Sequence, residues 1–192
     1  MADKSKGKIV INSPVILGFS AVCLVSLLLN ILTHGRTNEL FFSVYRSSLL
    51  NPLTYLRFFG HACGHANWSH FFGNMTLLLI LGPLLEEKYG KGDIALVMVV
   101  TALVTGLVNF IFFPHVALLG ASGIVFAFIL LSSFTGVKEG KIPLTFILVA
   151  VIYIGQQVYD GIFLKDNISN LAHIVGGIVG CVFGFAENKI RR

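Results

Sequence analysis

Six long apolar stretches constrain this sequence more than any other feature. A helix needs roughly 17 to 25 mainly apolar residues to cross the hydrocarbon core of a membrane. Six segments approach that length, namely residues 14–32, 68–85, 94–113, 119–137, 142–158 and 168–186. Hydrophobic residues make up 55% of the 192 residues and charged residues 12%, against about 25% charged residues in a typical soluble protein. The sequence therefore predicts an all-α, polytopic membrane protein with six transmembrane helices in one bundle.

The basic residues predict the orientation of this bundle. Ten of the 14 lysines and arginines lie before the first segment, after the last, or in the connections around residues 86–93 and 138–141. The remaining four are Arg36, Arg46, Arg57 and Lys165. The positive-inside rule assigns the larger group to the cytoplasm, so both termini are expected there and the number of crossings is even. The net charge of +5 then reflects membrane topology, and no nucleic-acid partner is expected.

The chain divides simply. We expect a basic cytoplasmic segment at residues 1–13, a single membrane domain at residues 14–186 and a basic cytoplasmic tail at residues 187–192. No small-residue cleavage site follows the first apolar segment, which predicts an uncleaved helix. The three cysteines are scattered and form neither a disulfide framework nor a metal motif. No metal or organic cofactor is expected.

Two connections depart from a plain bundle. Residues 33–67 are long and carry apolar and aromatic side chains throughout, so we expect this first external loop to associate with the membrane and pack against the bundle. Residues 112–122 are interrupted by Pro114 and Gly120. Irregular backbone at membrane depth persists only where it is buried in protein or lines water. Gly120 and Ser122 should therefore border a cavity.

Polar side chains within the spans converge on the same region. His70 and Asn74 are four residues apart and share one helix face. His173 lies in the first turns of the last span, and Ser122 near the start of the fourth. An unpaired polar group in an apolar medium costs roughly 2 to 7 kcal/mol, so polar residues at this depth tend to meet and to be functional. We expect the four to meet at the external end of the bundle.

Small residues predict which spans meet. A four-residue ladder on the last span matches the small-xxx-small pattern of helices that pack nearly backbone to backbone. The ladder consists of Ala172, Gly176, Gly180 and Gly184. Gly123 and Ala127 offer a matching groove on the fourth span. Pairing these two spans would bring Ser122 to His173.

The chemistry that such a group could share is acyl transfer. A serine hydroxyl becomes a nucleophile when a neighbouring base takes its proton, and His173 is the candidate base for Ser122. The Ser122 backbone N–H, His70 and Asn74 could donate hydrogen bonds to the oxyanion. Two glycines, Gly120 and Gly123, would let a substrate carbonyl approach the backbone, and Phe126 would orient the imidazole by packing. No acidic third member is apparent, so we predict a dyad.

Other interpretations of the same residues remain open. A lone transmembrane serine is more often a packing residue than a nucleophile. The four histidines His61, His65, His70 and His173 could instead be zinc ligands, although no HExxH motif supplies a general base. Polar residues could also line a transporter pathway, although no inverted repeat with broken helices is apparent.

Three motifs occur in order on the second, fourth and sixth spans. They are "HANWSHFFGN" (65–74), "GASG" (120–123) and "AHIVGGIVG" (172–180). Together they resemble the rhomboid family of intramembrane serine proteases, most closely its minimal six-helix bacterial form. The resemblance implies that Ser122 and His173 are the catalytic pair and that His70 and Asn74 support the oxyanion hole. It also implies a bacterial inner-membrane location.

Some positions depart from the family pattern or have less defined roles. The family often has tryptophan before the loop arginine, where this chain has Leu56 before Arg57, and tyrosine where it has Phe126. His61 and His65 are expected to support the loop, and Glu86 and Lys88, in "GPLLEEKYG", to be structural. A rhomboid-like protein that binds membrane clients without cutting them is a further alternative, against which the presence of both Ser122 and His173 argues.

The implied function is hydrolysis of a peptide bond in or beside a transmembrane helix of a membrane-protein substrate. Such a helix must unwind locally before its carbonyls can be attacked, which predicts helix-weakening residues near the cleaved bond; the resemblance implies a small side chain at that bond. Residues 142–158 contain few small residues, so this span is a candidate lateral gate. Membrane lipid is the expected surrounding, and the oligomeric state is not predicted.

Overall fold

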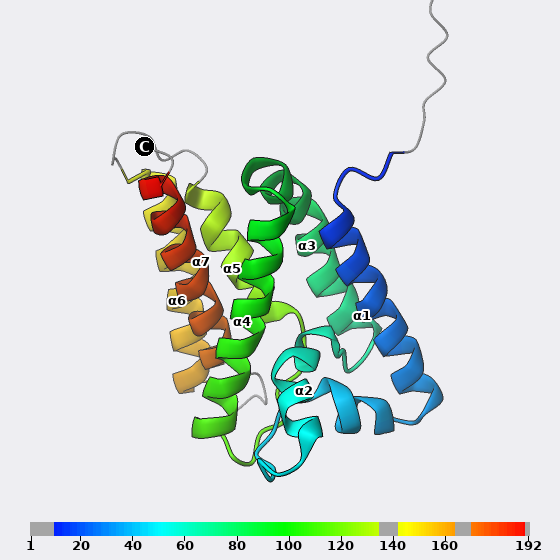
Figure 1. Cartoon of the computed structure of the whole chain (residues 1–192). Coiled ribbons are helices and arrows are strands. Elements are labelled where there is room, and N and C mark those ends of the chain that lie inside the picture. The colour runs from blue at the N-terminus through cyan, green and yellow to red at the C-terminus, as the bar shows by residue number, and fades with distance from the viewer. Residues whose placement is uncertain (1–9, 135–141, 164–169, 191–192) are drawn as a thin grey trace, which may run out of the picture.

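The computed structural model describes residues 10–134, 142–163 and 170–190, and this part of the chain is a bundle of helices (Figure 1). The helices are α1 (Pro14–Leu32), a π-helix (Asn38–Phe42), α2 (Pro52–Gly60), a 3₁₀ turn (His61–Cys63), α3 (Trp68–Tyr89), α4 (Lys91–Phe112), α5 (Ser122–Ser133), α6 (Leu144–Phe163) and α7 (Asn170–Ile190). The predicted all-α bundle is confirmed. In Figure 1 the chain enters α1 at the same end of the bundle at which α7 finishes.

Most of the basic residues that predict orientation lie outside the described residues. They are Lys4, Lys6, Lys8, Lys138, Lys141, Lys165, Arg191 and Arg192. The same holds for the ends of two predicted spans, at residues 135–137 and 168–169. The expected terminal segments at residues 1–13 and 187–192 are therefore described only in part.

Four of the described helices are long and apolar enough to cross a membrane, namely α1, α3, α4 and α7. Two more carry shorter apolar stretches, Ser122–Ser133 in α5 and Leu144–Tyr159 in α6. The predicted first span matches α1 at both ends. The next two spans, predicted at residues 68–85 and 94–113, were predicted too short. The helix α3 continues to Tyr89 and is followed by Gly90, which has φ +93°. The helix α4 already begins at Lys91. The count of six spans stays a prediction.

The predicted start of the fourth span at Leu119 is wrong, because α5 begins three residues later at Ser122. Leu118 exchanges two backbone hydrogen bonds of 2.9 Å with Val44, and the Gly120 N–H donates to the His61 carbonyl oxygen at 2.8 Å. Gly120 itself has φ +125°, which a side-chain-bearing residue rarely adopts. The backbone before Ser122 is thus held extended by partners that hydropathy does not reveal.

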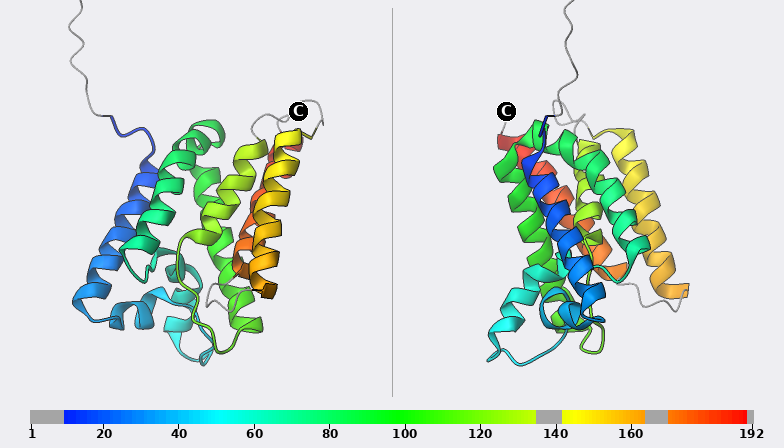
Figure 2. Two further views of the ribbon diagram at one scale, coloured as in Figure 1. Left: turned by 180° about the vertical axis from the view of Figure 1, so that it is seen from behind. Right: turned by 90° about the vertical axis from the view of Figure 1, so that its right-hand side faces the viewer.

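Because of this extended segment, α5 starts inside the bundle. Figure 2 shows the chain after α4 rising between the other helices before α5 begins, and α3 also starts part-way along the bundle. The expectation that the polar residues meet at the external end of the bundle stays a prediction. None of the α5 side chains is exposed, so the helix is the centre of the bundle.

Residues 33–67 pack against the bundle, as expected. Asn38 donates from Nδ2 to the His65 carbonyl oxygen at 3.0 Å, within the loop. Asn109 of α4 donates to the Val44 carbonyl oxygen at 3.1 Å. Arg57 is only 3% exposed, and its Nε donates to the Leu40 carbonyl oxygen at 2.9 Å. The loop is therefore a folded part of the protein that packs on the helices.

Glu86 occupies the structural position expected for it. Its two carboxylate oxygens accept hydrogen bonds from the backbone N–H groups of Val15 and Ile16, at 3.3 and 3.2 Å. These groups belong to the first turn of α1, where helical N–H groups lack partners and the helix dipole is positive. A buried carboxylate on α3 thus anchors the start of α1.

The ladder of small residues on α7 packs against α5. A Cβ atom added at Gly176 would collide with the backbone of Gly123, and one added at Gly180 would collide with the backbone of Ala127. Farther along, a Cβ at Gly184 would lie 2.8 Å from the Phe134 ring. Ala172, at the start of the ladder, is buried. The two helices therefore approach backbone to backbone, which fixes how Ser122 faces α7.

Candidate active site

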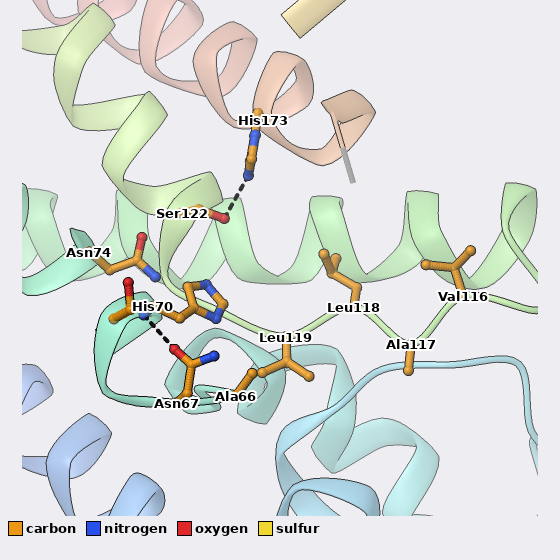
Figure 3. Close-up of a pocket in the computed structure, with 11 residues that line it drawn as sticks. Ala66, Asn67, His70, Asn74, Val116, Ala117, Leu118, Leu119, Ser122 and His173 are labelled. Atoms are coloured by element: carbon orange, nitrogen blue, oxygen red, sulfur yellow. Dashed lines mark hydrogen bonds between the residues drawn. The ribbon is translucent and has the colours of Figure 1, made fainter. Parts of the chain in front are cut away.

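The seam between α5 and α7 brings a serine to a histidine. Ser122 is the first residue of α5, and His173 lies in the first turn of α7. Their side chains are joined by a hydrogen bond of 2.8 Å between Ser122 Oγ and His173 Nε2 (Figure 3). The residues are 51 positions apart in the sequence, so the contact depends on the helix packing and not on local structure.

The imidazole of His173 makes two further contacts, one through the face of its ring and one through Nδ1. The Phe126 ring lies parallel to it, with 4.6 Å between centroids and 5° between planes. Phe126 in turn meets Tyr153 of α6 edge to face, with centroids 5.7 Å apart. His173 Nδ1 lies 2.6 Å from the side-chain oxygen Oε1 of Gln157, also on α6. Three helices therefore fix the orientation of this ring.

His70 and Asn74 line the same cavity as Ser122 and His173. The cavity has a volume of about 540 Å³ and is otherwise bounded by Ser69 of α3 and by residues that precede α3 and α5. In Figure 3, His70 and Asn74 lie on the side of Ser122 opposite His173. Ser122 also borders a smaller cavity of about 10 Å³, which Gly120 and Gly123 line as well. The structure thus brings all four predicted polar residues together.

Backbone donors lie next to these side chains. Ser122 is the first helical residue of α5, where a backbone N–H has no partner within the helix. The backbone of Gly120 lies close to His70. A Cβ atom added at Gly120 would be 2.6 Å from His70 Nε2 and 3.6 Å from Asn74 Nδ2. At Gly123 an added Cβ would lie 3.2 Å from Thr105 Cγ2. The glycines permit this close approach of backbone and side chains.

Asn74 is positioned by a residue from the loop. Asn74 Nδ2 lies 3.2 Å from His65 Nε2, while His65 Nδ1 lies 3.2 Å from the Cys63 carbonyl oxygen. His65 is fully buried. Burial, with a smaller contribution from the nearby His70, lowers the pKa of His65 from 6.5 to about 4. The ring is therefore neutral at physiological pH.

His61 lies apart from the serine and histidine side chains. Its Nε2 is 2.9 Å from the Ala102 carbonyl oxygen on α4, and its own carbonyl oxygen accepts from Gly120. Burial lowers the pKa of His61 from 6.5 to about 4. Within the described residues no three side chains among His, Cys, Asp and Glu are grouped as a metal site requires. His61 and His65 thus contact the segments that carry the cavity, consistent with a supporting role.

Sequence reasoning missed Gln157. The prediction of a dyad rests on the lack of an acidic residue near His173, but a neutral amide can also serve as a third group. A signal was present, since two adjacent glutamines, Gln156 and Gln157, interrupt an otherwise apolar span. Their sequence does not say which of the two faces α7. The structure has Gln157 only 8% exposed and Gln156 exposed.

Comparison with known proteins supports the resemblance that the sequence motifs indicate, and it extends over most of the chain. Residues 52–189 match the model of the Rhomboid domain family. The rhomboid protease GlpG of Haemophilus influenzae is 27% identical over 140 residues, which cover 71% of each chain. Rhomboid-related protein 2 of Mus musculus is 30% identical over 158 residues, covering 71% of this chain and 52% of the mouse protein. Rhomboid-like protein 11 of Arabidopsis thaliana is 30% identical over 140 residues, covering 65% and 50%. The alignments thus span about half of the mouse and plant proteins.

Proposed function

Because the chain belongs to the rhomboid family, we propose that it is an intramembrane serine endopeptidase that uses Ser122 and His173 to hydrolyse a peptide bond in or next to a transmembrane helix. Proteins named rhomboid protease are among its relatives. The apolar helices and the family make it an integral membrane protein. Its substrates would be membrane proteins.

The observation that carries the proposal is the 2.8 Å hydrogen bond between Ser122 Oγ and His173 Nε2 at the wall of a 540 Å³ cavity. A nucleophile and its base must lie within about 2.6 to 3.2 Å of each other. The same cavity is lined by two side chains that can donate hydrogen bonds, His70 and Asn74. A client-binding protein without activity would not need this arrangement.

Acylation follows from the geometry. Ser122 Oγ attacks the scissile carbonyl carbon while its proton moves to His173 Nε2. The carbonyl oxygen becomes an oxyanion, which the Ser122 backbone N–H, Asn74 and His70 stabilise by hydrogen bonds. When the intermediate collapses, the C–N bond breaks and His173 returns the proton to the leaving amine. An acyl ester on Ser122 remains.

Deacylation repeats these steps with water. A water molecule in the cavity loses a proton to His173 Nε2 and attacks the ester carbonyl, and the proton then returns to Ser122 Oγ as the acid product leaves. Since Ser122 is the first residue of a central helix, water reaches it through the cavity and not through lipid. The irregular segment at residues 113–121 forms part of that wall.

Substrate choice should follow backbone accessibility. A helical substrate keeps its carbonyl groups in internal hydrogen bonds, so a bond can enter the cavity only where the helix unwinds. We expect preference for substrates with helix-weakening residues near the cleaved bond and with a small side chain at that bond. Membrane orientation is proposed with both termini in the cytoplasm of a bacterium, and with residues 14–186 as the membrane domain.

The test is cleavage of a generic single-span substrate by the purified protein in detergent. Wild type should release two fragments, and Ser122→Ala and His173→Ala should each remove nearly all turnover while retaining the thermal stability of the wild type. A fluorophosphonate probe should label wild type and fail to label Ser122→Ala.

Three outcomes would overturn the proposal. Substrate binding without cleavage, across several single-span substrates, would favour a client-binding protein. Cleavage that a chelator abolishes, combined with no labelling of Ser122, would favour a metalloenzyme. Cleavage by Ser122→Ala at the wild-type rate would exclude the proposed nucleophile.

A further inference from the structure

We propose that Gln157 of α6 is a positioning residue for the reaction: its side-chain oxygen accepts the Nδ1–H of His173, which fixes the tautomer in which Nε2 is free to take the proton of Ser122. This inference rests on the proposed function. It turns the predicted dyad into a chain of three side chains from three helices, with a neutral amide as the third member.

The geometry supports this assignment at both ring nitrogens. His173 Nδ1 lies 2.6 Å from Gln157 Oε1, and His173 Nε2 lies 2.8 Å from Ser122 Oγ. An amide oxygen can only accept a hydrogen bond. Nδ1 must therefore carry the ring proton in this arrangement, and the neutral ring then has an unprotonated Nε2 facing the serine hydroxyl.

The choice of tautomer matters for the rate. In serine proteases of the Ser-His-Asp type, a third group that accepts from Nδ1–H holds the imidazole in its productive tautomer, and the wrong tautomer costs about 10⁴ in kcat. A neutral amide fills the corresponding position in Cys-His-Asn enzymes. Gln157 can provide the orientation without placing a charge in the apolar centre of the bundle.

Burial indicates that Gln157 has a specific partner and is not a surface residue. Among the α6 side chains whose burial is described, residues 144–159 and 162–163, Gln157 is the only one that is buried. The other described side chains of this helix are partly or fully exposed. A buried amide without partners costs free energy, and the described partner of this one is the imidazole.

The location on α6 links this helix to the chemistry. α6 packs against α5 and α7, and it carries both Gln157 and Tyr153, whose ring contacts Phe126 beside the imidazole. If α6 moves away to admit a substrate, Gln157 moves with it. The base would regain its orientation only when α6 returns, so loss of Gln157 should affect turnover more than binding.

The experiment compares four purified proteins on one substrate: wild type, Gln157→Met, Gln157→Glu and the control Gln156→Met. Methionine keeps the length of glutamine but has no oxygen to accept from Nδ1–H. We expect Gln157→Met to lower kcat by about 10- to 100-fold, less than the total of about 10² to 10⁴ that acid–base catalysis contributes, with little change in KM. The exposed Gln156→Met should match wild type.

Gln157→Glu tests the direction of the hydrogen bond. A carboxylate can still accept from Nδ1–H, so this variant should retain far more activity than Gln157→Met. Ser122 and Phe126 of α5, which also contact the ring, are uncharged. A carboxylate beside the ring favours its protonated form, so the acid limb of the pH–kcat/KM profile should move to higher pH. A purely structural role would not produce this shift.

The outcomes separate this inference from the proposed function. The inference would be overturned if Gln157→Met had the kcat of the wild type. It would also be overturned if Gln157→Met and Gln157→Glu lost equal activity and the pH profile did not shift. In both cases cleavage by the wild type would still support the proposed function. Loss of thermal stability in Gln157→Met without rescue of kcat by Gln157→Glu would assign Gln157 to packing, and this also rejects the inference. If wild type neither cleaves nor labels at Ser122, the proposed function itself fails.

Discussion

Asn74 illustrates how a single side chain of the candidate site is held for its proposed role. Its amide lies 3.2 Å from His65 Nε2 and lines the cavity beside Ser122. His65 is neutral and fully buried, and it fixes the direction in which the amide points. The proposed oxyanion donor is thus oriented by the loop that precedes α3 and not by its own helix alone.

Asn74→Ala should reduce kcat and leave the reaction detectable. Losing one oxyanion donor typically costs about 10² to 10³ in kcat, and the Ser122 backbone N–H and His70 remain. The measurement is steady-state cleavage of the single-span substrate, with the midpoint of thermal unfolding as the control for folding. Unchanged kcat in a folded Asn74→Ala protein would remove Asn74 from the oxyanion hole.

The sequence was sufficient to predict that Ser122, His173, His70 and Asn74 lie together, because polar residues in apolar spans must find partners. It could not identify the partner of the second imidazole nitrogen. Whether Gln156 or Gln157 faces α7 depends on the rotation of α6 about its axis, which is set by packing. The hydrogen bond from Asn74 to His65 was hidden for a related reason, since it joins a helix to an irregular loop.

At the scale of helices, the seam between α5 and α7 should tolerate no added volume at its closest points. Gly176→Ala places a methyl group against the backbone of Gly123, and overpacking of this kind costs about 1 to 3 kcal/mol. Gly177→Ala is a matched control on the next residue, because its Cβ would lie an ordinary 3.6 Å from Leu130 Cγ. Thermal unfolding in detergent should show a lower midpoint for Gly176→Ala only, accompanied by lower kcat. Equal midpoints for the two variants would contradict the close backbone packing of α7 against α5 at Gly176.

Glu86 gives a second test at this scale. Glu86→Gln retains one oxygen but presents an NH₂ group to the backbone N–H groups of α1, so we expect the protein to lose about 0.5 to 2 kcal/mol of stability, as for a lost helix cap. Glu87 is exposed one residue later, and Glu87→Gln should leave the stability unchanged. Chemical or thermal unfolding of both variants is the measurement. If Glu86→Gln left the stability unchanged, solvent or another group would have to accept the hydrogen bonds of the first backbone N–H groups of α1.

Helix boundaries show where hydropathy is informative. The first span was predicted correctly at both ends because a proline begins it and apolar residues fill it. The fourth was extended too far toward its N-terminus because residues 119–121 continue the apolar run. Their backbone is nevertheless extended, since Leu118 pairs with Val44 and Gly120 donates to His61. Contacts between segments far apart in the chain decided this boundary.

For the whole molecule, the buried loop histidines predict how stability depends on pH. The pKa values of His61 and His65 are lowered by burial from 6.5 to about 4. Between these values the unfolded chain binds more protons than the folded one, so stability is complete above about pH 6.5 and falls as pH decreases toward about 4. Each histidine contributes a slope of up to about 1.4 kcal/mol per pH unit.

Thermal unfolding between pH 7.5 and 4.5 measures this dependence. His65→Gln should reduce the slope, whereas His34→Gln, at an exposed position, should leave it unchanged. Stability that is constant or that rises on acidification would contradict the buried, neutral state of the two rings.

The overall architecture followed from the sequence because hydropathy fixes the helices and the small-residue ladder fixes the central pair. The folded loop at residues 33–67 was less predictable in detail. Its internal bonds, such as that of Arg57 with the Leu40 carbonyl oxygen, join residues that show no regular spacing. Its role in holding His61 and His65 against the site emerges only from the three-dimensional structure.

The short length of α5 has a bearing on the surrounding lipid. Its 12 residues span about 18 Å at 1.5 Å per residue, well below the roughly 30 Å thickness of the hydrocarbon core. Since no side chain of α5 is exposed, neighbouring parts of the protein cover this helix along its length. Its length therefore fits the interior of the bundle and need not match the thickness of the hydrocarbon core.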